Sequence, residues 1–422
     1  MKNANALHQS GYLDSVPVIL CLKKQIDFAK ALLSFWAGGY WVIPVSPDLN
    51  ELHLNQIKET TGALYFDEDD WIEIQKKDFI LNRSTKYKES GIYHLTSGST
   101  GAPKLCIRTV EALINEGKDY QKKFNILNSD KIMSLCPIYH SFALGGALMS
   151  AIVSGAYFHA IDFFYPRTAI DSIIREKITY ITSVPFLAEI ICKIPIKNKE
   201  NYSVRTVVIG AGKVTECLND KFFNRFGVKL SVNYGSTETG GLISRNGQEP
   251  FESLGKPMDS VTVKLCDDNG HIVDRGMEGE AFVKTKSMLS SYYLQQVMLD
   301  SDGFFAMGDI LKQDHEGYFY LVGRKRCFVK IGGKSVSTKE IETSLKDFDG
   351  ITDCYVDIKS QPSSDYHIVA YIVSCKEISQ WEIRDFCKKR LENYKIPSDF
   401  IFVNQIPRNK LGKIVKEQLL KL

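Results

Sequence analysis

The stretch that decides how this chain folds is Leu95–Lys104, which is Leu-Thr-Ser-Gly-Ser-Thr-Gly-Ala-Pro-Lys. Its two glycines let the backbone turn sharply and come close to a ligand. Its four hydroxyl side chains can donate hydrogen bonds, and its lysine adds a positive charge. Donors and a cation around a bare backbone are suited to holding a polyphosphate. We therefore predict a phosphate-binding loop, made of Thr96, Ser97, Gly98, Ser99, Thr100, Gly101 and Lys104.

This loop is not the common P-loop, whose pattern closes with Gly-Lys followed by Ser or Thr. Here Pro103 precedes Lys104 and Leu105 follows it, so the phosphate cradle is of another kind. A flexible Ser/Gly linker is the alternative interpretation, but linkers seldom end in Pro-Lys. The apolar run Ile92–Leu95 leads into the loop and predicts a strand.

Length, charge and cysteine content set the broad class of the chain. Its 422 residues can bury large cores and should form at least two domains. It carries 53 Lys and Arg against 50 Asp and Glu, a net charge of +3. This balance predicts no nucleic-acid partner and no attachment to a membrane surface. The 10 cysteines show no Cys-x-x-Cys pair and no zinc-ligand spacing, so we expect a cytoplasmic protein.

One uncharged segment, Ser141–Ile161, is about long enough to cross a bilayer. It is rich in Gly, Ala and Ser, contains His159, and runs directly into Asp162. These features favour a buried helix followed by a strand. We therefore expect no integral membrane segment.

The order of apolar runs and helical patterns predicts an α/β fold. Repeated strand–helix–strand units imply mostly parallel sheets covered by helices. The units are Val18–Leu22, Ile26–Trp36 and Tyr40–Val45, and then Tyr180–Val184, Phe186–Cys192 and Thr206–Ile209.

From Val261 onward the pattern changes to hairpins of an antiparallel β unit, with a turn at Asp268–Gly270. After Gly323 a small α+β unit follows, in which Ser379 and Glu382 form a predicted capping box. We therefore expect a large domain over residues 1–323 and a small, mobile C-terminal domain over residues 324–422.

Several motifs, taken in order, resemble those of the adenylate-forming (AMP-binding) enzymes. This superfamily includes acyl- and aryl-CoA ligases, luciferases and the adenylation domains of peptide synthetases. Family members usually carry some dozens more residues before the position of Ala37, so we expect a shortened first subdomain. Besides the loop, the matching stretches are Ala37–Pro47, Asn233–Glu238, Gly308-Asp309 with Gly317-Tyr318, Gly323–Glu342 with Arg326 and Cys327 at its hinge, and Pro407–Lys413.

The resemblance implies a role for each charged residue around ATP. The loop and Lys104 would hold the β- and γ-phosphates, and Thr237 would bond the α-phosphate. Glu238 would bind Mg²⁺, which usually takes few carboxylates. Lys413 would catalyse adenylation by neutralising the charge between the substrate carboxylate and the α-phosphate. Without the motifs, Glu238 could be a surface carboxylate and Lys413 a solvated lysine.

The resemblance also implies a place for the nucleoside. Tyr234-Gly235 would offer an aromatic face to adenine, and Gly210-Ala211-Gly212 a bare backbone to the other face. Asp309 would bind the ribose hydroxyls, and Arg324 the ribose or phosphate oxygens. A dinucleotide fingerprint fails here because Thr215 stands where its third glycine belongs. Asp309 could also be an ordinary turn aspartate.

The substrate acid is indicated by Pro137–Gly145, which resembles the pocket motif of acyl-CoA ligases, with His140 as its gate. Domains that activate amino acids carry a Phe-Asp pair near here, and its carboxylate holds the α-ammonium. This chain has Ser141-Phe142 instead, and a buried unpaired ammonium would be costly. We therefore expect an aryl or fatty acid. His140 could instead be a core histidine.

The second half-reaction needs a thiol. By resemblance, Gly332-Gly333 would line a tunnel for the pantetheine arm, whose bearer is either coenzyme A or a carrier-protein phosphopantetheine. Two alternatives remain open. One is a stand-alone ligase that serves an acyl or aryl carrier protein of a siderophore or antibiotic pathway. The other is a catalytically impaired relative that only binds nucleotide.

Overall fold

The chain divides into two compact units in the computed structural model. The first comprises Met1–Lys264, Phe282–Phe305 and Glu316–Tyr320, and the second Leu265–Ala281, Ala306–His315 and Leu321–Leu422. The expected boundary after residue 323 stays a prediction. The structure describes residues 16–49, 51–76, 90–96, 104–162, 164–195, 202–325, 328–331, 334–360, 366–408 and 414–419.

A six-stranded sheet in the first unit carries the phosphate loop. Its strand order is β15-β5-β4-β2-β1-β3. β1 pairs in parallel with β2 and β3, and β2 with β4, whereas β4 and β5 are antiparallel. The predicted strands and the helix between them are therefore confirmed. The elements are β1 Val18–Leu20, α2 Gln25–Gly38, β2 Trp41–Pro44, α3 Glu51–Thr61, β3 Leu64–Phe66, α4 Glu68–Lys76, β4 Gly91–Thr96, β5 Lys104–Thr109 and β15 Ser291–Tyr292.

A seven-stranded sheet in the same unit has the order β12-β11-β10-β9-β8-β6-β7. The strands from β7 to β10 are parallel, and β11 and β12 are antiparallel additions. The elements are α5 Val110–Lys123, β6 Lys131–Ser134, β7 Tyr157–His159, α8 Pro166–Arg175, β8 Tyr180–Ser183, α9 Pro185–Lys193, β9 Thr206–Ile209, α10 Glu216–Phe226, β10 Ser231–Ser236, β11 Gly240–Arg245 and β12 Lys256–Pro257.

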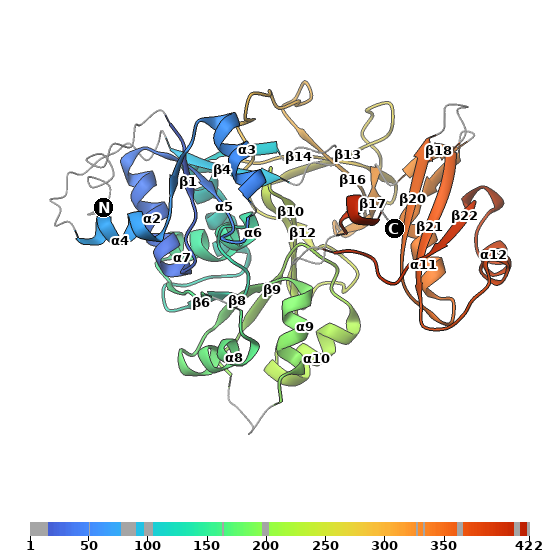
Figure 1. The fold of residues 1–422 in the computed structure, drawn as a ribbon, viewed down its shortest axis with the longest axis horizontal. Coiled ribbons are helices and arrows are strands. Elements are labelled where there is room, and N and C mark those ends of the chain that lie inside the picture. Colours follow the sequence, from blue (N-terminus) through green and yellow to red (C-terminus); the bar gives the residue numbers. More distant parts are fainter. Residues whose placement is uncertain are drawn as a thin grey trace. The chain divides into compact units, whose positions relative to one another are not determined.

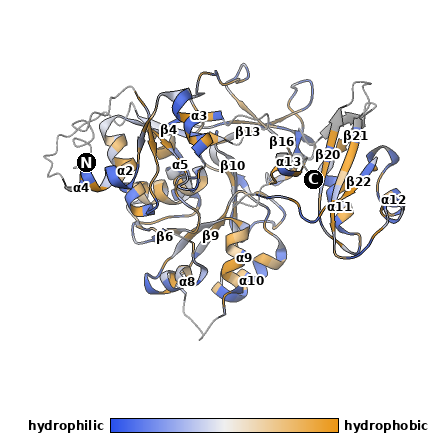
Figure 2. Cartoon of the chain, in the orientation of Figure 1, coloured by the Kyte–Doolittle hydropathy of each residue, from blue (hydrophilic) through white to orange (hydrophobic). Residues whose placement is uncertain are grey.

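Helices α9 and α10 lie beside β9 (Figure 1), because their apolar faces share one core with this sheet. In that core Val207 and Ile209 of β9 join Ile191 of α9 and Phe222 of α10, all at most 1% exposed. Figure 2 shows apolar residues concentrated on strands such as β9 and β21. Burial of these strands explains why they are continuous apolar runs rather than alternating ones.

The uncharged segment is buried over Ala143–Ala151, within its helical part as expected, but it is not one regular helix. It forms α6 (Ser141–Ala143), the π-helix η2 (Leu144–Met149) and α7 (Ser150–Ser154), and then leads into β7. A Cβ at Gly145 would collide with the Glu116 carboxylate, so this close approach requires glycine. In the part of the chain that the structure describes, no helix is long and apolar enough to cross a membrane.

The remaining strands form smaller sheets. β13 (Thr262–Cys266), β14 (Glu278–Lys284), β16 (Phe305–Gln313) and β17 (Phe319–Arg324) form a four-stranded sheet in that order. Within the second unit, β20, β21 and β22 form a three-stranded sheet, and Ile341 of α11 and Ile383 of α12 pack in its core. The predicted capping box at Ser379 and Glu382 is confirmed. The elements are β18 Phe328–Ile331, β19 Lys334–Ser337, α11 Thr338–Lys346, β20 Ile351–Ser360, β21 Tyr366–Ser374, α12 Gln380–Lys388, η4 Asn393–Lys395, β22 Asp399–Phe402 and α13 Lys416–Leu419.

Candidate active site

The β4–β5 hairpin brings the two ends of the predicted phosphate loop together. Thr96 and Lys104 face each other in its register, and the Thr96 hydroxyl donates a hydrogen bond to the Lys104 carbonyl at 3.2 Å. The loop therefore starts and ends at one point, as a phosphate cradle requires. Its other predicted residues, Ser97, Gly98, Ser99, Thr100 and Gly101, lie outside the described residues.

Glu238 and Thr237 are held next to this hairpin, where the Cys106 thiol of β5 donates to the Thr237 carbonyl at 3.6 Å. The Tyr292 hydroxyl donates to Glu238 Oε1 at 3.2 Å, and Lys104 Nζ lies 5.4 Å from the centre of the Tyr292 ring. The backbone N–H of Leu289 donates to the Glu238 carbonyl at 2.6 Å. Burial, followed by the charge of Glu238, raises the pKa of the Tyr292 hydroxyl, so it stays a donor at neutral pH. The predicted cation and the predicted metal ligand thus meet around one tyrosine.

The proposed adenine-binding residues lie at one edge of the seven-stranded sheet. Gly210-Ala211-Gly212 follows the carboxyl end of β9, and Tyr234-Gly235 lies near the carboxyl end of its parallel neighbour β10. Ala211 adopts a left-handed backbone with φ of 59°, which re-aims the chain after β9. The register of β10 shifts between Tyr234 and Gly235. Ligands of open α/β sheets bind outside the carboxyl ends of the strands, and these residues lie there.

His140 lies directly before α6 and is mostly buried. Its ring centre lies 4.6 Å from that of Tyr139, and burial lowers its pKa to about 4. His94 on β4 is 3% exposed, and neither ring nitrogen has a hydrogen-bond partner in the described structure. Burial, followed by the charge of Arg108, lowers the pKa of His94 to about 3. Both imidazoles are therefore neutral at pH 7. Each neutral ring has one nitrogen that can donate a hydrogen bond and one that can accept one.

A buried ion pair joins these elements. Arg108 Nη2 lies 2.6 Å from Glu116 Oε2, with both side chains at most 1% exposed. Arg108 Nε donates to the Ser287 carbonyl at 2.8 Å, and Glu116 Oε1 accepts from the Gly241 N–H at 3.1 Å. The pair therefore ties β5 and α5 to β11 and to the segment before β15. Because Thr237 and Glu238 precede β11 directly, this pair fixes their position relative to β5.

The second unit brings Asp309 and Arg324 together. Asp309 on β16 is 2% exposed, and its Oδ1 lies 2.8 Å from Nε of Arg324 on β17. A cavity of about 450 Å³ is lined here by Met307, Gly308, Arg324 and Lys325. The other predicted residues of this unit, Gly332, Gly333 and Lys413, lie outside the described residues.

Comparison with known families decides which family the chain belongs to. The model of the AMP-binding enzyme family matches residues 1–293, and that of the AMP-binding enzyme C-terminal domain matches residues 340–413. The chain belongs to the AMP-binding enzyme family. The predicted resemblance is therefore confirmed.

Curated relatives of this AMP-binding enzyme are CoA ligases. Indoleacetate–CoA ligase of Aromatoleum aromaticum is 28% identical over 337 residues, which cover 78% of this chain and 66% of the relative. Crotonobetaine/carnitine–CoA ligase of Salmonella typhimurium is 28% identical over 338 residues, covering 77% and 65%. The match thus spans slightly less than two thirds of the length of these relatives.

Solved structures share the fold at low sequence identity. ATP-bound MatB from Rhodopseudomonas palustris superimposes with a TM-score of 0.86 at 20% identity, covering 100% of this chain and 91% of that one. O-succinylbenzoate coenzyme A synthetase from Bacillus subtilis, in complex with ATP and magnesium ion, gives 0.85 at 22% identity, covering 99% and 92%. The predicted α/β fold, with its separate sheets and small C-terminal sheet domain, is confirmed.

Sequence reasoning did not find three features of this AMP-binding enzyme: Tyr292, His94 and the Arg108–Glu116 pair. Tyr292 comes from a two-residue strand within Ser290–Tyr293, which carries no recognisable motif. A histidine between Tyr93 and Leu95 in an apolar strand was the one available signal for His94. A buried ion pair between β5 and α5 has no signature in the sequence, because its burial depends on β11 and η2 packing over it.

Proposed function

We propose that this AMP-binding enzyme is an ATP-dependent acid–thiol ligase. It activates a carboxylic acid to an acyl-adenylate, passes the acyl group to a thiol, and releases AMP and pyrophosphate. The observation that carries the proposal is the meeting of Lys104, Tyr292 and Glu238 beside the loop hairpin. A cation, a carboxylate and a hydroxyl-rich loop are the groups that bind a magnesium polyphosphate.

Adenylation joins two anions. One oxygen of the substrate carboxylate bonds to the α-phosphorus while the bond to pyrophosphate breaks. Lys104 and the loop would stabilise the departing pyrophosphate, and Thr237 would hold the α-phosphate. Glu238 offers a single carboxylate, which fits Mg²⁺; the ion, when bound, would neutralise phosphate charge. Lys413 would supply the remaining positive charge at the point of attack.

The acid is an aryl or fatty acid without an α-amino group. Amino-acid-activating domains place a Phe-Asp pair at the position where Ser141 follows the gate residue His140. This motif therefore offers no carboxylate to bind an α-ammonium. His140 is neutral at pH 7 because its pKa is about 4, so it adds no charge to the pocket. The CoA ligases similar to this chain are named for indoleacetate, crotonobetaine or carnitine, and 2-succinylbenzoate.

The thiol is that of coenzyme A or of a carrier-protein phosphopantetheine. Its sulfur would bond to the acyl carbon while the bond from that carbon to AMP breaks. Gly332-Gly333 would line the tunnel for this arm, since residues without side chains leave space for it. The similar CoA ligases favour coenzyme A over a carrier protein.

Acid-dependent ATP–pyrophosphate exchange tests this function. A panel of aryl and fatty acids is offered with Mg²⁺, beside free amino acids as the matched control. We expect exchange with at least one acid, and thioester after coenzyme A or a phosphopantetheinylated carrier is added. Robust exchange with a free amino acid would refute the acid class. Nucleotide binding without exchange for any acid would favour the catalytically impaired relative.

Gly332→Leu tests the thiol step separately. The bulky side chain should narrow the tunnel without touching the phosphate loop or Lys413. Pyrophosphate exchange should survive while thioester yield falls. Thioester formation at the normal rate would show that Gly332 does not line the path of the thiol.

A further inference from the structure

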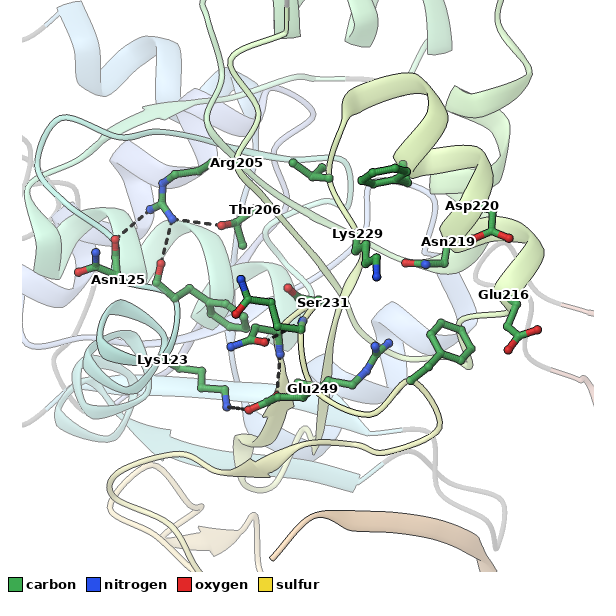
Figure 3. A pocket seen from close by; sticks show the side chains of 18 residues that line it. Lys123, Asn125, Arg205, Thr206, Glu216, Asn219, Asp220, Lys229, Ser231 and Glu249 are labelled. Atoms are coloured by element: carbon green, nitrogen blue, oxygen red, sulfur yellow. Dashed lines mark hydrogen bonds and ion pairs between the residues drawn. The ribbon is translucent and has the colours of Figure 1, made fainter. Parts of the chain in front are cut away.

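A cavity of about 970 Å³ (Figure 3) is lined by residues from the amino ends of strands in the seven-stranded sheet, at the opposite edge from the proposed adenine-binding residues. Thr206 at the start of β9 and Ser231 at the start of β10 line it, together with Arg245 at the end of β11. The candidate active site uses the carboxyl ends of the same parallel strands. The two sites are therefore separated by the length of these strands.

Arg245 is an unusual residue for a cavity wall, because it is 2% exposed and still lacks a polar partner. No hydrogen bond or ion pair joins its guanidinium to any residue that the structure describes, and its Nε is fully enclosed. The contact that it does make is with the ring of Phe251, whose centre lies 4.9 Å from Cζ. Burial lowers the pKa of Arg245, and the charges of Glu249 and Glu252 oppose this shift only in part. A buried cation with unused donors is costly unless an acceptor reaches it.

The two carboxylates near Arg245, those of Glu249 and Glu252, contact other groups. Glu249 accepts hydrogen bonds from Lys123 Nζ at 3.3 Å and from the Asn246 N–H at 2.8 Å. Glu252 lies 3.7 Å from Lys213 Nζ. Neither reaches the guanidinium of Arg245 within hydrogen-bond distance. Both carboxylates therefore act on Arg245 through their charge alone, and neither forms a hydrogen bond or an ion pair with it.

Lys229 adds a second cation without a partner in the described structure. It lies next to Ser231 in the middle of the lining (Figure 3), and its stem packs against the turn after Arg245. A Cβ at Gly247 would lie 2.7 Å from Cβ of Lys229, so the turn approaches this lysine closely. Arg205, by contrast, is held by Asp130 at 2.6 Å. The acidic residues of the lining besides Glu249 are Glu216 and Asp220, which are exposed on α10.

We propose that this cavity binds a small organic anion, in which a carboxylate or phosphate group is carried on an apolar body. Arg245 is the buried anchor for the anionic group, and Lys229 is the second cation. Phe124, Phe223 and Phe251 provide apolar surface for the rest of the ligand. Guanidinium groups bind carboxylates and phosphates through paired hydrogen bonds, which gives the anchor its specificity. This site is independent of the acid–thiol ligase proposal.

Calorimetric titration of the full chain with benzoate and with inorganic phosphate tests the site. Arg245→Met removes the charge and keeps the length of the side chain, so affinity should fall about tenfold or more. Lys229→Gln should weaken binding a few-fold, and its matched control, Lys221→Gln on the exposed face of α10, should change nothing. Equal affinities of the wild type and Arg245→Met for both anions, or no binding by the wild type, would overturn the proposal.

Location and folding are checked separately. A crystal soaked with 4-bromobenzoate should show its bromine in this cavity with the carboxylate at Arg245. Arg245→Lys keeps a cation and should retain part of the affinity, and its thermal unfolding midpoint reports whether the fold is intact. If Arg245→Met does not fold, the bromine position and Lys229→Gln decide. The absence of bromine from this cavity, with Lys229→Gln binding normally, would overturn the proposal, whether or not bromine also occupies the proposed acid pocket.

Discussion

Arg108 and Arg245 are both enclosed arginines of the first unit, exposed by 0% and 2%, but their surroundings differ. Arg108 is bound by Glu116 and by the carbonyl of Ser287, whereas Arg245 lies on an aromatic ring and has no acceptor in the described structure. A buried charge with fixed partners holds elements together, and its loss should affect stability. A charge whose donors remain unused is available to a ligand, and its loss should affect binding.

The same contrast applies across the candidate active site. Arg108 and Glu116 bind each other and backbone groups, so we propose that they position Thr237 and Glu238. Lys104 and Glu238 contact Tyr292 and lie beside the phosphate loop, so we propose that they bind ligands. Substitutions should therefore separate into those that unfold the chain and those that leave a stable chain with weak activity.

The largest effect is expected for Glu116→Ala. It leaves Arg108 buried without its carboxylate, which should lower the free energy of unfolding by about 3–5 kcal/mol. Urea unfolding followed by circular dichroism measures this. The matched control is Lys122→Ala, which removes a pair with Asp259 at 3.5 Å whose side chains are 65% and 67% exposed. That change should stay below about 1 kcal/mol. Equal losses of unfolding free energy in the two variants would contradict the distinction between buried and exposed ion pairs.

Lys413→Ala should have the opposite profile. Adenylation should slow about a hundredfold or more, as the loss of one positioned transition-state donor does, while the unfolding midpoint stays unchanged. Thioester formation from synthetic acyl-adenylate should change much less. Pyrophosphate exchange and the second half-reaction are measured side by side. Equal loss in both half-reactions would remove the catalytic role from Lys413.

His94 is a buried group whose ring nitrogens have no hydrogen-bond partner among the described residues, and it is neutral at pH 7. Its pKa is lowered from 6.5 to about 3, by burial first and then by the charge of Arg108. Below pH 6.5, His94 is therefore protonated in the unfolded chain and stays neutral in the folded chain. The free energy of unfolding therefore falls as the pH falls. At pH 5 this one group should account for about 2 kcal/mol.

His94→Leu should remove that pH dependence. The difference in unfolding free energy between pH 7 and pH 5 should become about 2 kcal/mol smaller than in the wild type. Substitution of His53, which lies exposed on α3, by Gln is the control and should leave the difference intact. If the pH dependence of the unfolding free energy is the same in His94→Leu as in the wild type, His94 takes up a proton equally readily in the folded and unfolded chains.

How far the sequence predicts this molecule depends on whether the signal is local. The loop at Leu95–Lys104 and the strand–helix–strand units are local patterns, so the strand before the loop and the parallel sheets were predictable. Tyr292 pairs with Glu238, which is distant in sequence, and the folded sheet alone brings them together. The π-helix Leu144–Met149 was also unpredicted, and so was the close approach of Glu116 on α5 to its Gly145. Contacts of this kind are tertiary and leave no periodic pattern.

The smallest effect in this series is expected for Glu238→Gln, the carboxylate that we assign to Mg²⁺. The amide keeps the shape of the side chain and can still accept the hydrogen bond from Tyr292, but it loses the negative charge. The Mg²⁺ concentration for half-maximal exchange should therefore rise about tenfold, since the metal retains its phosphate and water ligands. Tyr292→Phe is the matched variant: it keeps the charge of Glu238 and removes the hydroxyl that orients it, so its Mg²⁺ requirement should rise less. Stability should change little in either variant, because neither leaves a buried charge without a partner. An unchanged metal titration in Glu238→Gln would show that Glu238 does not bind the metal.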